Sequence, residues 1–294
     1  MLESPNSNII RVTGGEGGEV FLITGRKGAA VVDAGMAYCG EAAVRNIREI
    51  LGSEPLDFVL ISHTHYDHVG GIPFFRRAWP DVAVIGDSHA KKTLLKESAQ
   101  RLIRDLSDKA AIKFGAAPAE YSPEELVIDE IVKDGDIIDL GNIQIEVVKT
   151  PGHTKCSLAF FLRNESILFA SETTGVFDQG DIAPTYLVGY HDTLEAIKRC
   201  RNLRAKHIIS PHYGPVEPEY AKIYWDLAQK AVESSKDFIL RLYREGYDKQ
   251  DIMQRYRRRY RSELAMSQQI TEAFELNADR TIELVIREFG GDIK

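Results

Sequence analysis

Seven consecutive residues, Ser62-His63-Thr64-His65-Tyr66-Asp67-His68, contain three imidazoles and one carboxylate. Burying so many polar groups without partners would be unfavourable. Imidazole nitrogens and carboxylate oxygens are the donors that zinc and iron prefer in proteins. The segment therefore predicts a metal site. Its spacing predicts two adjacent ions, because His63 and His65 point the same way in extended backbone, and a turn at Tyr66 would let Asp67 and His68 reach a second ion.

Further donors follow three other expected strands. His153 comes after IQIEVVK, Glu172 after ILFAS, and His212 after HIIS. Open α/β sheets place their sites at the carboxyl ends of strands, so we expect these three side chains to join the cluster.

The other histidines and the cysteines lack such a setting. We interpret His89, His191 and His207 as structural, with His191 the first exception to consider because it follows the loop after Glu172. Cys39, Cys156 and Cys200 are widely spaced without a CxxC pair, which argues against a disulfide framework or a cysteine-rich zinc module. We expect each to be a small buried hydrophobe; a catalytic Cys156, three residues after His153, is the sharper alternative.

The elements that position these residues follow from hydrophobic periodicity. The chain opens with three short β-like runs, Ile9 to Val12, Val20 to Thr24 and Ala29 to Val32, which predict antiparallel strands. Further expected elements are helices at 41–51, 72–79, 88–105 and 193–203, strands at 57–61, 82–85, 137–139, 143–149, 157–162 and 166–170, and a connecting loop at 106–125. Both halves pass from strands through metal-type residues into a helix, which predicts two similar layers around one core.

From Glu217 onward the pattern changes to long amphipathic helices. We therefore divide the chain into a catalytic domain, residues 1–216, and a helical extension, residues 217–294, that covers the cleft, dimerises or does both. Tyr224, Trp225, Phe238 and Tyr243 offer apolar surface for a homodimer, and packing onto the main domain is the equal alternative.

Composition narrows the function classes. The chain has 44% hydrophobic and 28% charged residues and a net charge of -7, which argues against a general nucleic-acid binder. We find no export signal at the start and no apolar run long enough for a membrane span, and we expect a cytoplasmic protein. Five arginines interleaved with Tyr256 and Tyr260, between Arg255 and Arg261, could grip phosphates, or could form a solvated helix face with its aromatics packed inward.

Residues 63–68 match, without a gap, the HxHxDH signature of the metallo-β-lactamase superfamily, which the chain resembles over roughly residues 8–215. Val31-Val32-Asp33-Ala34-Gly35 is similar to the family's early strand. The resemblance implies a four-layer αββα sandwich. It also implies two ligand sets, which are His63, His65 and His153 for one metal and Asp67, His68 and His212 for the other.

Two carboxylates complete the expected site. Asp33 would orient a ligand by hydrogen bonding, or serve only as a strand-end turn residue. Glu172 stands where the family usually has Asp, so one extra methylene separates its carboxylate from the backbone. It would bridge the two ions, or remain a strand-end Glu that leaves one site incomplete.

Two divalent ions, zinc or iron with manganese a further candidate, would activate water for hydrolysis, and Asp67 would orient that water. The helical tail resembles that of thioester-hydrolysing members and of the PqsE-like proteins. This likeness implies a small-molecule ester or thioester substrate. The alternatives are a phosphodiesterase or nuclease, and a non-catalytic ligand-binding regulator on the same fold.

Overall fold

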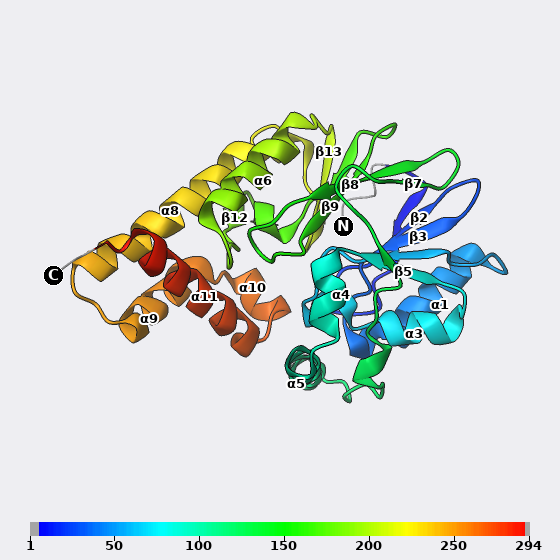
Figure 1. The fold of residues 1–294 in the computed structure, drawn as a ribbon, viewed down its shortest axis with the longest axis horizontal. Coiled ribbons are helices and arrows are strands. Elements are labelled where there is room, and N and C mark those ends of the chain that lie inside the picture. The colour runs from blue at the N-terminus through cyan, green and yellow to red at the C-terminus, as the bar shows by residue number, and fades with distance from the viewer. Residues whose placement is uncertain (1–5, 292–294) are drawn as a thin grey trace.

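The computed structural model of the protein describes residues 6–291 and shows two sheets packed face to face, with helices on both outer faces (Figure 1). This arrangement confirms the predicted α/β class and the four-layer αββα sandwich with a C-terminal group of helices. Residues 1–5, part of the opening segment that we searched for an export signal, lie outside the described residues.

The first six-stranded sheet has the order β1-β2-β3-β4-β5-β6. It begins with the predicted antiparallel strands and continues with parallel pairs from β3 to β6. Its strands are β1 (Ile9–Arg11), β2 (Phe21–Thr24), β3 (Ala29–Val32), β4 (Phe58–Leu60), β5 (Ala83–Gly86) and β6 (Glu130–Ile131). The sequence did not indicate β6, because both of its residues are exposed and carry no alternation.

The second six-stranded sheet has the order β14-β13-β10-β9-β8-β7, and only the pair β10 and β13 is parallel. Its strands are β7 (Ile137–Asp139), β8 (Gln144–Lys149), β9 (Leu158–Leu162), β10 (Ile167–Phe169), β13 (His207–Ser210) and β14 (Gly214–Pro215). A separate hairpin pairs β11 (Val176–Asp178) with β12 (Asp181–Ala183).

Side-chain alternation assigns each strand residue to one of the core layers. Along β3, Ala30 and Val32 pack between the sheets with residues such as Phe160 of β9. Val31, on the other face, packs beneath the helices with Ile47. One strand therefore contributes to two layers of apolar packing, which fixes its register because a shift of one residue would exchange the faces.

The helices of the main body are α1 (Gly40–Leu51), α2 (Tyr66–Val69), α3 (Ile72–Ala78), α4 (Ser88–Leu94), α5 (Glu97–Lys113) and α6 (Tyr190–Asn202), with short 3-10 turns η1 (Ala37–Cys39), η2 (Pro123–Glu125) and η3 (Glu172–Thr174). Two expectations were wrong here. The helix expected over 88–105 is two helices, and α5 continues to Lys113 through part of the expected loop. Ala110 and Ala111 in that part are fully buried, so small side chains extend the apolar face of α5 where larger ones would have given a clearer pattern.

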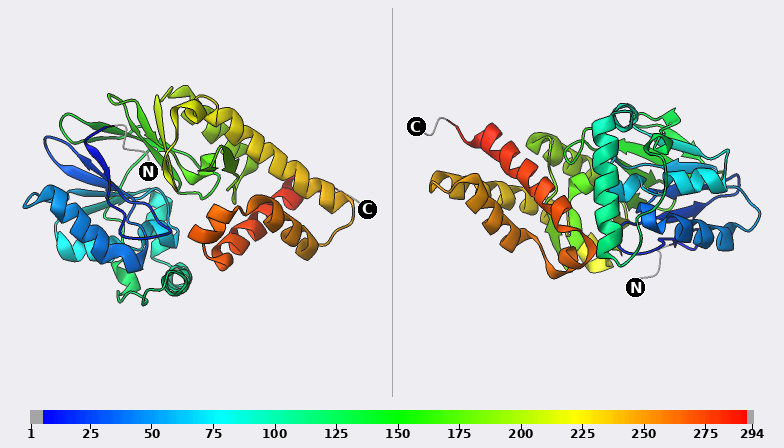
Figure 2. Two further views of the ribbon diagram at one scale, coloured as in Figure 1. Left: turned by 180° about the vertical axis from the view of Figure 1, so that it is seen from behind. Right: turned by 90° about the horizontal axis from the view of Figure 1, so that it is seen from below.

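The C-terminal helices lie beside the opening between the two halves (Figure 2). They are α7 (Pro218–Ala221), α8 (Tyr224–Arg244), α9 (Lys249–Tyr260), α10 (Glu263–Gln268) and α11 (Thr271–Phe289). Their buried residues join one apolar cluster with the outer face of the second sheet, for example Ile239 and Ile282 with Leu168. The division at residues 216 and 217 stays a prediction. No helix among residues 6–291 combines the length and apolarity needed to cross a bilayer.

Candidate metal centre

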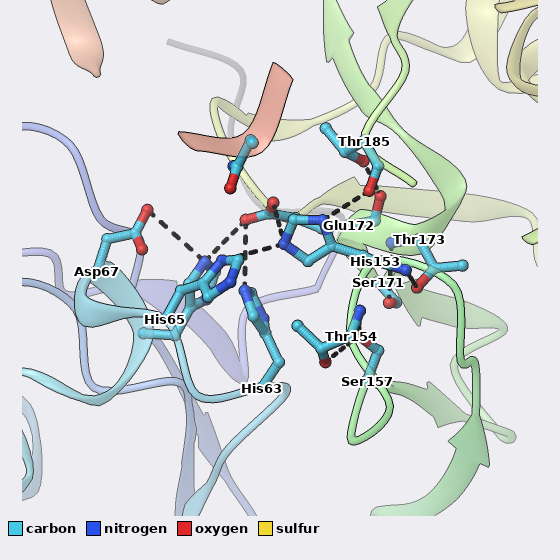
Figure 3. Close-up of polar contacts among 12 residues, drawn as sticks. His63, His65, Asp67, His153, Thr154, Ser157, Ser171, Glu172, Thr173 and Thr185 are labelled. Atoms are coloured by element: carbon cyan, nitrogen blue, oxygen red, sulfur yellow. Dashed lines mark hydrogen bonds and ion pairs between the residues drawn. The ribbon is translucent and has the colours of Figure 1, made fainter. Parts of the chain in front are cut away.

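Each expected ligand lies just beyond the carboxyl end of a strand. The loop after β4 and helix α2 carry the HxHxDH segment, and the loops after β8, β10 and β13 carry the other three side chains. The residues gathered in this way are His63, His65, Asp67, His68, His153, Glu172 and His212. In Figure 3, His63, His65, His153 and Glu172 point toward one another, and Asp67 lies to one side of them.

Two groups of donor atoms form within this cluster. His63, His65, His153 and Glu172 offer one set, and Asp67, His68, Glu172 and His212 offer the other; within each set the donor atoms lie within 4.8 Å of one another. These are the two sets that the resemblance implied, with Glu172 common to both. The structure thus brings together every residue that the sequence proposed as a ligand.

Glu172 spans the two sets through its separate oxygens. Its Oε1 lies 2.7 Å from His212 Nε2 and 2.9 Å from His68 Nε2. Its Oε2 lies 3.0 Å from His153 Nε2, as the dashed line in Figure 3 marks. The extra methylene, relative to Asp, therefore does not keep this carboxylate out of the cluster, and the geometry favours a bridging role.

Asp33 contacts one member of the second set, His68, on the side of the ring that faces away from Glu172. Its carboxylate accepts hydrogen bonds from the Ser62 backbone N–H at 2.7 Å and the Ser62 hydroxyl at 2.8 Å. It also lies 2.8 Å from His68 Nδ1, so that nitrogen donates to Asp33 while Nε2 faces Glu172. Asp33 itself has left-handed backbone, with φ at 58°. Asp33 is therefore placed to orient His68, and this role stays a prediction.

His153 is held by residues that the sequence did not single out. Its Nδ1 donates to the Thr185 carbonyl oxygen at 2.6 Å, and its backbone N–H donates to the Thr173 hydroxyl at 3.0 Å. The Thr173 hydroxyl donates in turn to the Thr150 carbonyl oxygen at 2.6 Å. No motif marked these threonines, because their contacts join loops that are far apart in the sequence.

The electrostatics of the first donor set, which is His63, His65, His153 and Glu172, fit a divalent cation. Burial and the neighbouring imidazoles lower the pKa of His63 well below its ordinary value and that of His65 to about 3, so both rings are neutral and offer lone pairs. Burial would raise the pKa of Glu172, but His153 and His212 lower it well below its usual range. His63 Nε2 is buried and has no hydrogen-bond partner among the described residues. Neutral imidazoles, an ionised carboxylate and one orphaned nitrogen form a suitable donor set.

The remaining histidines stay apart from this centre. Neither donor set contains His89, His191 or His207. His191 lies with its ring centroid 5.5 Å from Tyr190 and 5.9 Å from Phe289, which is an aromatic packing role.

The cysteines are buried, as expected. Cys156 lies 3.2 Å from the Thr154 hydroxyl oxygen, and burial raises the pKa of its thiol. A thiol of raised pKa is a poor nucleophile near neutral pH, which disfavours the alternative of a catalytic Cys156.

Two cavities meet at the cluster. We call them the α9–α11 cavity and the α5–α11 cavity. Their volumes are about 800 Å³ and about 770 Å³, and both volumes include space that is open to solvent. Both are lined by Asp67 and Glu172 and by Gln269 and Asn277 from the C-terminal helices. No motif marked the last two residues, because Gln269 lies in the turn between α10 and α11, Asn277 lies on α11, and only the packing of these helices brings them to the site.

A four-layer sandwich with such a cluster beyond the carboxyl ends of its strands is typical of the class of metallo-hydrolases. The family model described as the metallo-beta-lactamase superfamily matches residues 13–212, and the chain belongs to this superfamily. This membership confirms the resemblance drawn from the HxHxDH signature and the expected hydrolase class.

Curated relatives are distant. A metallo-beta-lactamase fold-containing protein of Sulfurisphaera tokodaii is 24% identical over 68% of this chain and 74% of its own length. The acyl-coenzyme A thioesterase MBLAC2 of Gallus gallus is 26% identical over 54% of this chain and 58% of its own. The atrochrysone carboxyl ACP thioesterase of Emericella nidulans is 25% identical over 83% of this chain and 67% of its own. This chain thus spans little more than half of the avian thioesterase.

Among solved structures, a metallo-beta-lactamase family protein of Thermus thermophilus aligns with a TM-score of 0.65 at 17% identity. The alignment covers 98% of this chain and 95% of that one. At this identity the likeness shows the fold alone, and it includes the region of the C-terminal helices.

Proposed function

We propose that the protein hydrolyses an ester or thioester of a small acyl-bearing substrate with the help of two divalent metal ions, zinc or iron with manganese a further candidate. The observation that carries this proposal is the pair of cavities that meet at Asp67 and Glu172 beneath the C-terminal helices. Covered, partly apolar cavities suit an acyl substrate better than a polymer. The thioesterases among the relatives support the same substrate class.

The chain's own residues would hold the reacting groups. His63, His65 and His153 would bind one ion, Asp67, His68 and His212 the other, and Glu172 both. Ions held there supply an acidified water molecule and an electrophile for the acyl oxygen. Asp67 also faces both cavities, so its carboxylate would orient the attacking water, although a metal ligand has limited freedom to take a proton.

The residues of the arginine-rich helix α9 do not support the phosphodiesterase alternative. Tyr256 is 3% exposed and lines the α9–α11 cavity, so it cannot stack on an external base. Arg257 lies 3.1 Å from Glu275 and Arg261 donates to the Gln269 carbonyl oxygen, so two of the arginines have intramolecular partners. This pattern favours the solvated helix face with its aromatics packed inward.

Two of the four aromatic residues that we expected at a homodimer interface are not available for it. Tyr224 is fully buried and Trp225 is 8% exposed within the single chain, so neither offers a free apolar surface. Phe238 and Tyr243 are only partly buried, and a dimer through the C-terminal helices stays a prediction.

Elemental analysis of the purified protein, combined with assays on thioester, lactone and phosphodiester substrates, tests the proposal. We expect two metals per chain and metal-dependent thioester or ester turnover. Glu172→Gln should lose metal and activity, Glu172→Asp should retain part of both, and the matched Glu146→Gln, which removes a carboxylate paired with Arg163 at 2.8 Å, should retain both. At most one metal and no turnover in the wild type would refute the dinuclear hydrolase and favour the non-catalytic regulator.

A further inference from the structure

The two cavities differ in the chemistry of their walls. The part of the α5–α11 cavity beyond the metal cluster is formed largely by aliphatic side chains, which are Ala99, Leu102, Ile103, Leu106, Ala273 and Leu276. The first four come from α5 and the last two from α11. An apolar wall of this kind favours hydrocarbon over a polar or charged group.

The α9–α11 cavity has a mixed wall, in which apolar side chains such as Val176, Leu187 and Phe274 alternate with hydroxyl, amide and carboxyl groups. Tyr213, Tyr256 and Tyr260 line it together with Gln268, Thr281 and Asp178. Tyr213 follows the ligand His212 directly and has left-handed backbone, with φ at 68°. Beyond the ligand cluster this wall offers several hydrogen-bonding side chains, whereas the wall of the α5–α11 cavity is largely aliphatic, so the α9–α11 cavity is the better fit for a group that carries hydrogen-bonding atoms.

Two carboxamides stand where the cavities meet. Gln269 and Asn277 line both of them beside Asp67 and Glu172, and neither side-chain amide makes a hydrogen bond to another described residue. Amide N–H groups that face a cavity are available to an acyl oxygen or to the heteroatom attached to it. A bond placed at this junction would have its apolar part on one side and its polar part on the other.

We propose that the α5–α11 cavity is the acyl-chain subsite, which selects a medium-length aliphatic acyl group, and that the polar leaving group occupies the α9–α11 cavity. The assignment of the scissile bond to the junction rests on the proposed function. Helix α11 contributes to both arms, so the C-terminal helices determine substrate specificity in addition to covering the site. Ala273 sets the space for the chain, because it is a small side chain that is 4% exposed in the wall of the apolar arm.

Binding of straight-chain carboxylates to the metal-loaded protein tests the subsite without requiring turnover. The probes are acetate, butanoate, hexanoate, octanoate and decanoate, measured by isothermal titration calorimetry. Each methylene that enters an apolar subsite should increase the affinity about fourfold. The wild type should therefore show rising affinity with chain length until the arm is filled.

Two matched substitutions on α11 test which cavity binds the acyl chain. Ala273→Leu fills the apolar arm and should flatten the dependence on chain length, whereas Ala278→Leu, at a residue that is 3% exposed and lines the other cavity, should preserve it. Leu102→Ser is the second test, since Leu102 is 46% exposed and its replacement should not prevent folding. It should weaken decanoate binding and leave acetate binding unchanged.

The proposed subsite would be overturned if the wild type bound all the carboxylates with the same affinity. It would also be overturned if Ala278→Leu abolished the dependence of affinity on chain length while Ala273→Leu kept it. Turnover of acyl thioesters, measured in parallel, separates this inference from the proposed function. Chain-length-dependent binding without turnover of any ester or thioester would refute the hydrolase and leave the subsite standing. Turnover of thioesters with no preference for chain length in either kcat/KM or binding would refute the subsite alone.

Discussion

Asp33 makes three hydrogen bonds that together fix one ligand ring. The carboxylate accepts from both the backbone and the hydroxyl of Ser62 and from His68 Nδ1. Burial would lower the pKa of His68, but Asp33 and Asp67 raise it well above its ordinary value. The ring is therefore held with Nδ1 protonated toward Asp33, and its Nε2 is directed at the ligand cluster. A metal that displaces the Nε2 proton would find this nitrogen already in place.

Asp33→Asn keeps the shape of the side chain and removes the charge that orients His68. We expect the metal affinity to fall about 10- to 100-fold, the range found when a ligand loses its supporting partner. Competition with a chromophoric chelator would measure the change.

The control for this substitution is Asp87→Asn. Asp87 is also a buried aspartate at the end of a strand of the first sheet, but it pairs with Lys149 at 2.9 Å and does not contact the ligands. Its substitution should leave the metal affinity unchanged. Equal losses in the two variants would contradict the orienting role of Asp33.

At the scale of residues, the sequence predicted which side chains gather in the cluster better than it predicted the residues that hold them in place. The HxHxDH segment concentrates donors so strongly that a metal site follows from chemistry alone, and the separate His153, Glu172 and His212 follow from strand ends. Ser62, Thr173 and Thr185 act through hydrogen bonds that depend on the packed structure. Serine and threonine after a strand are too common to be informative before that packing is known.

At the scale of elements, the turn between β8 and β9 contains His153, and the residue before it, Gly152, has a backbone conformation that leaves no room for a side chain. Gly152 has φ at +144°, and a Cβ there would collide with the Thr193 hydroxyl and the Thr173 methyl group. We expect Gly152→Ala to lower the free energy of unfolding by about 1–3 kcal/mol from the backbone alone, with more from the contacts. It should also displace His153 and weaken metal binding. Thermal unfolding and metal titration measure the two effects.

Gly115→Ala is the matched control, because Gly115 also has positive φ, at +73°, but no atom lies within 4 Å of its added Cβ. This variant should show the backbone effect on stability and bind metal as the wild type does. If Gly152→Ala bound metal equally well, the tight turn would not be what positions His153.

The elements themselves could be predicted where apolar residues recur clearly. The three opening strands and the helix over 40–51 follow the pattern closely. The expected loop over 106–125 failed because α5 buries small residues, Ala110 and Ala111, which carry little periodic signal. The same helix supplies the aliphatic wall of the α5–α11 cavity, and of these wall residues only Leu106 lies in the part that we expected to be a loop.

At the scale of the whole molecule, the C-terminal helices are tied to the catalytic body close to the site. Lys113, at the end of α5, donates from Nζ to the carbonyl oxygens of Met266 and Gln269, the latter at 2.8 Å. Gly17 donates from its backbone N–H to the Gln268 side chain at 3.2 Å. These contacts hold α10 and the start of α11 over the junction of the two cavities.

Lys113→Met should loosen this connection without unfolding the protein. The side chain is largely exposed, so we expect a loss of about 1 kcal/mol in the local opening free energy and about fivefold faster hydrogen exchange over residues 263–270. Lys109→Met is the control, because Lys109 lies one turn earlier on α5 and pairs with Asp105 on the same helix. Hydrogen exchange followed by mass spectrometry should show faster exchange of α10 in the first variant alone. If exchange over 263–270 were unchanged in Lys113→Met, the cover over the site would be held by the apolar packing of α11 and not by its polar contacts with α5.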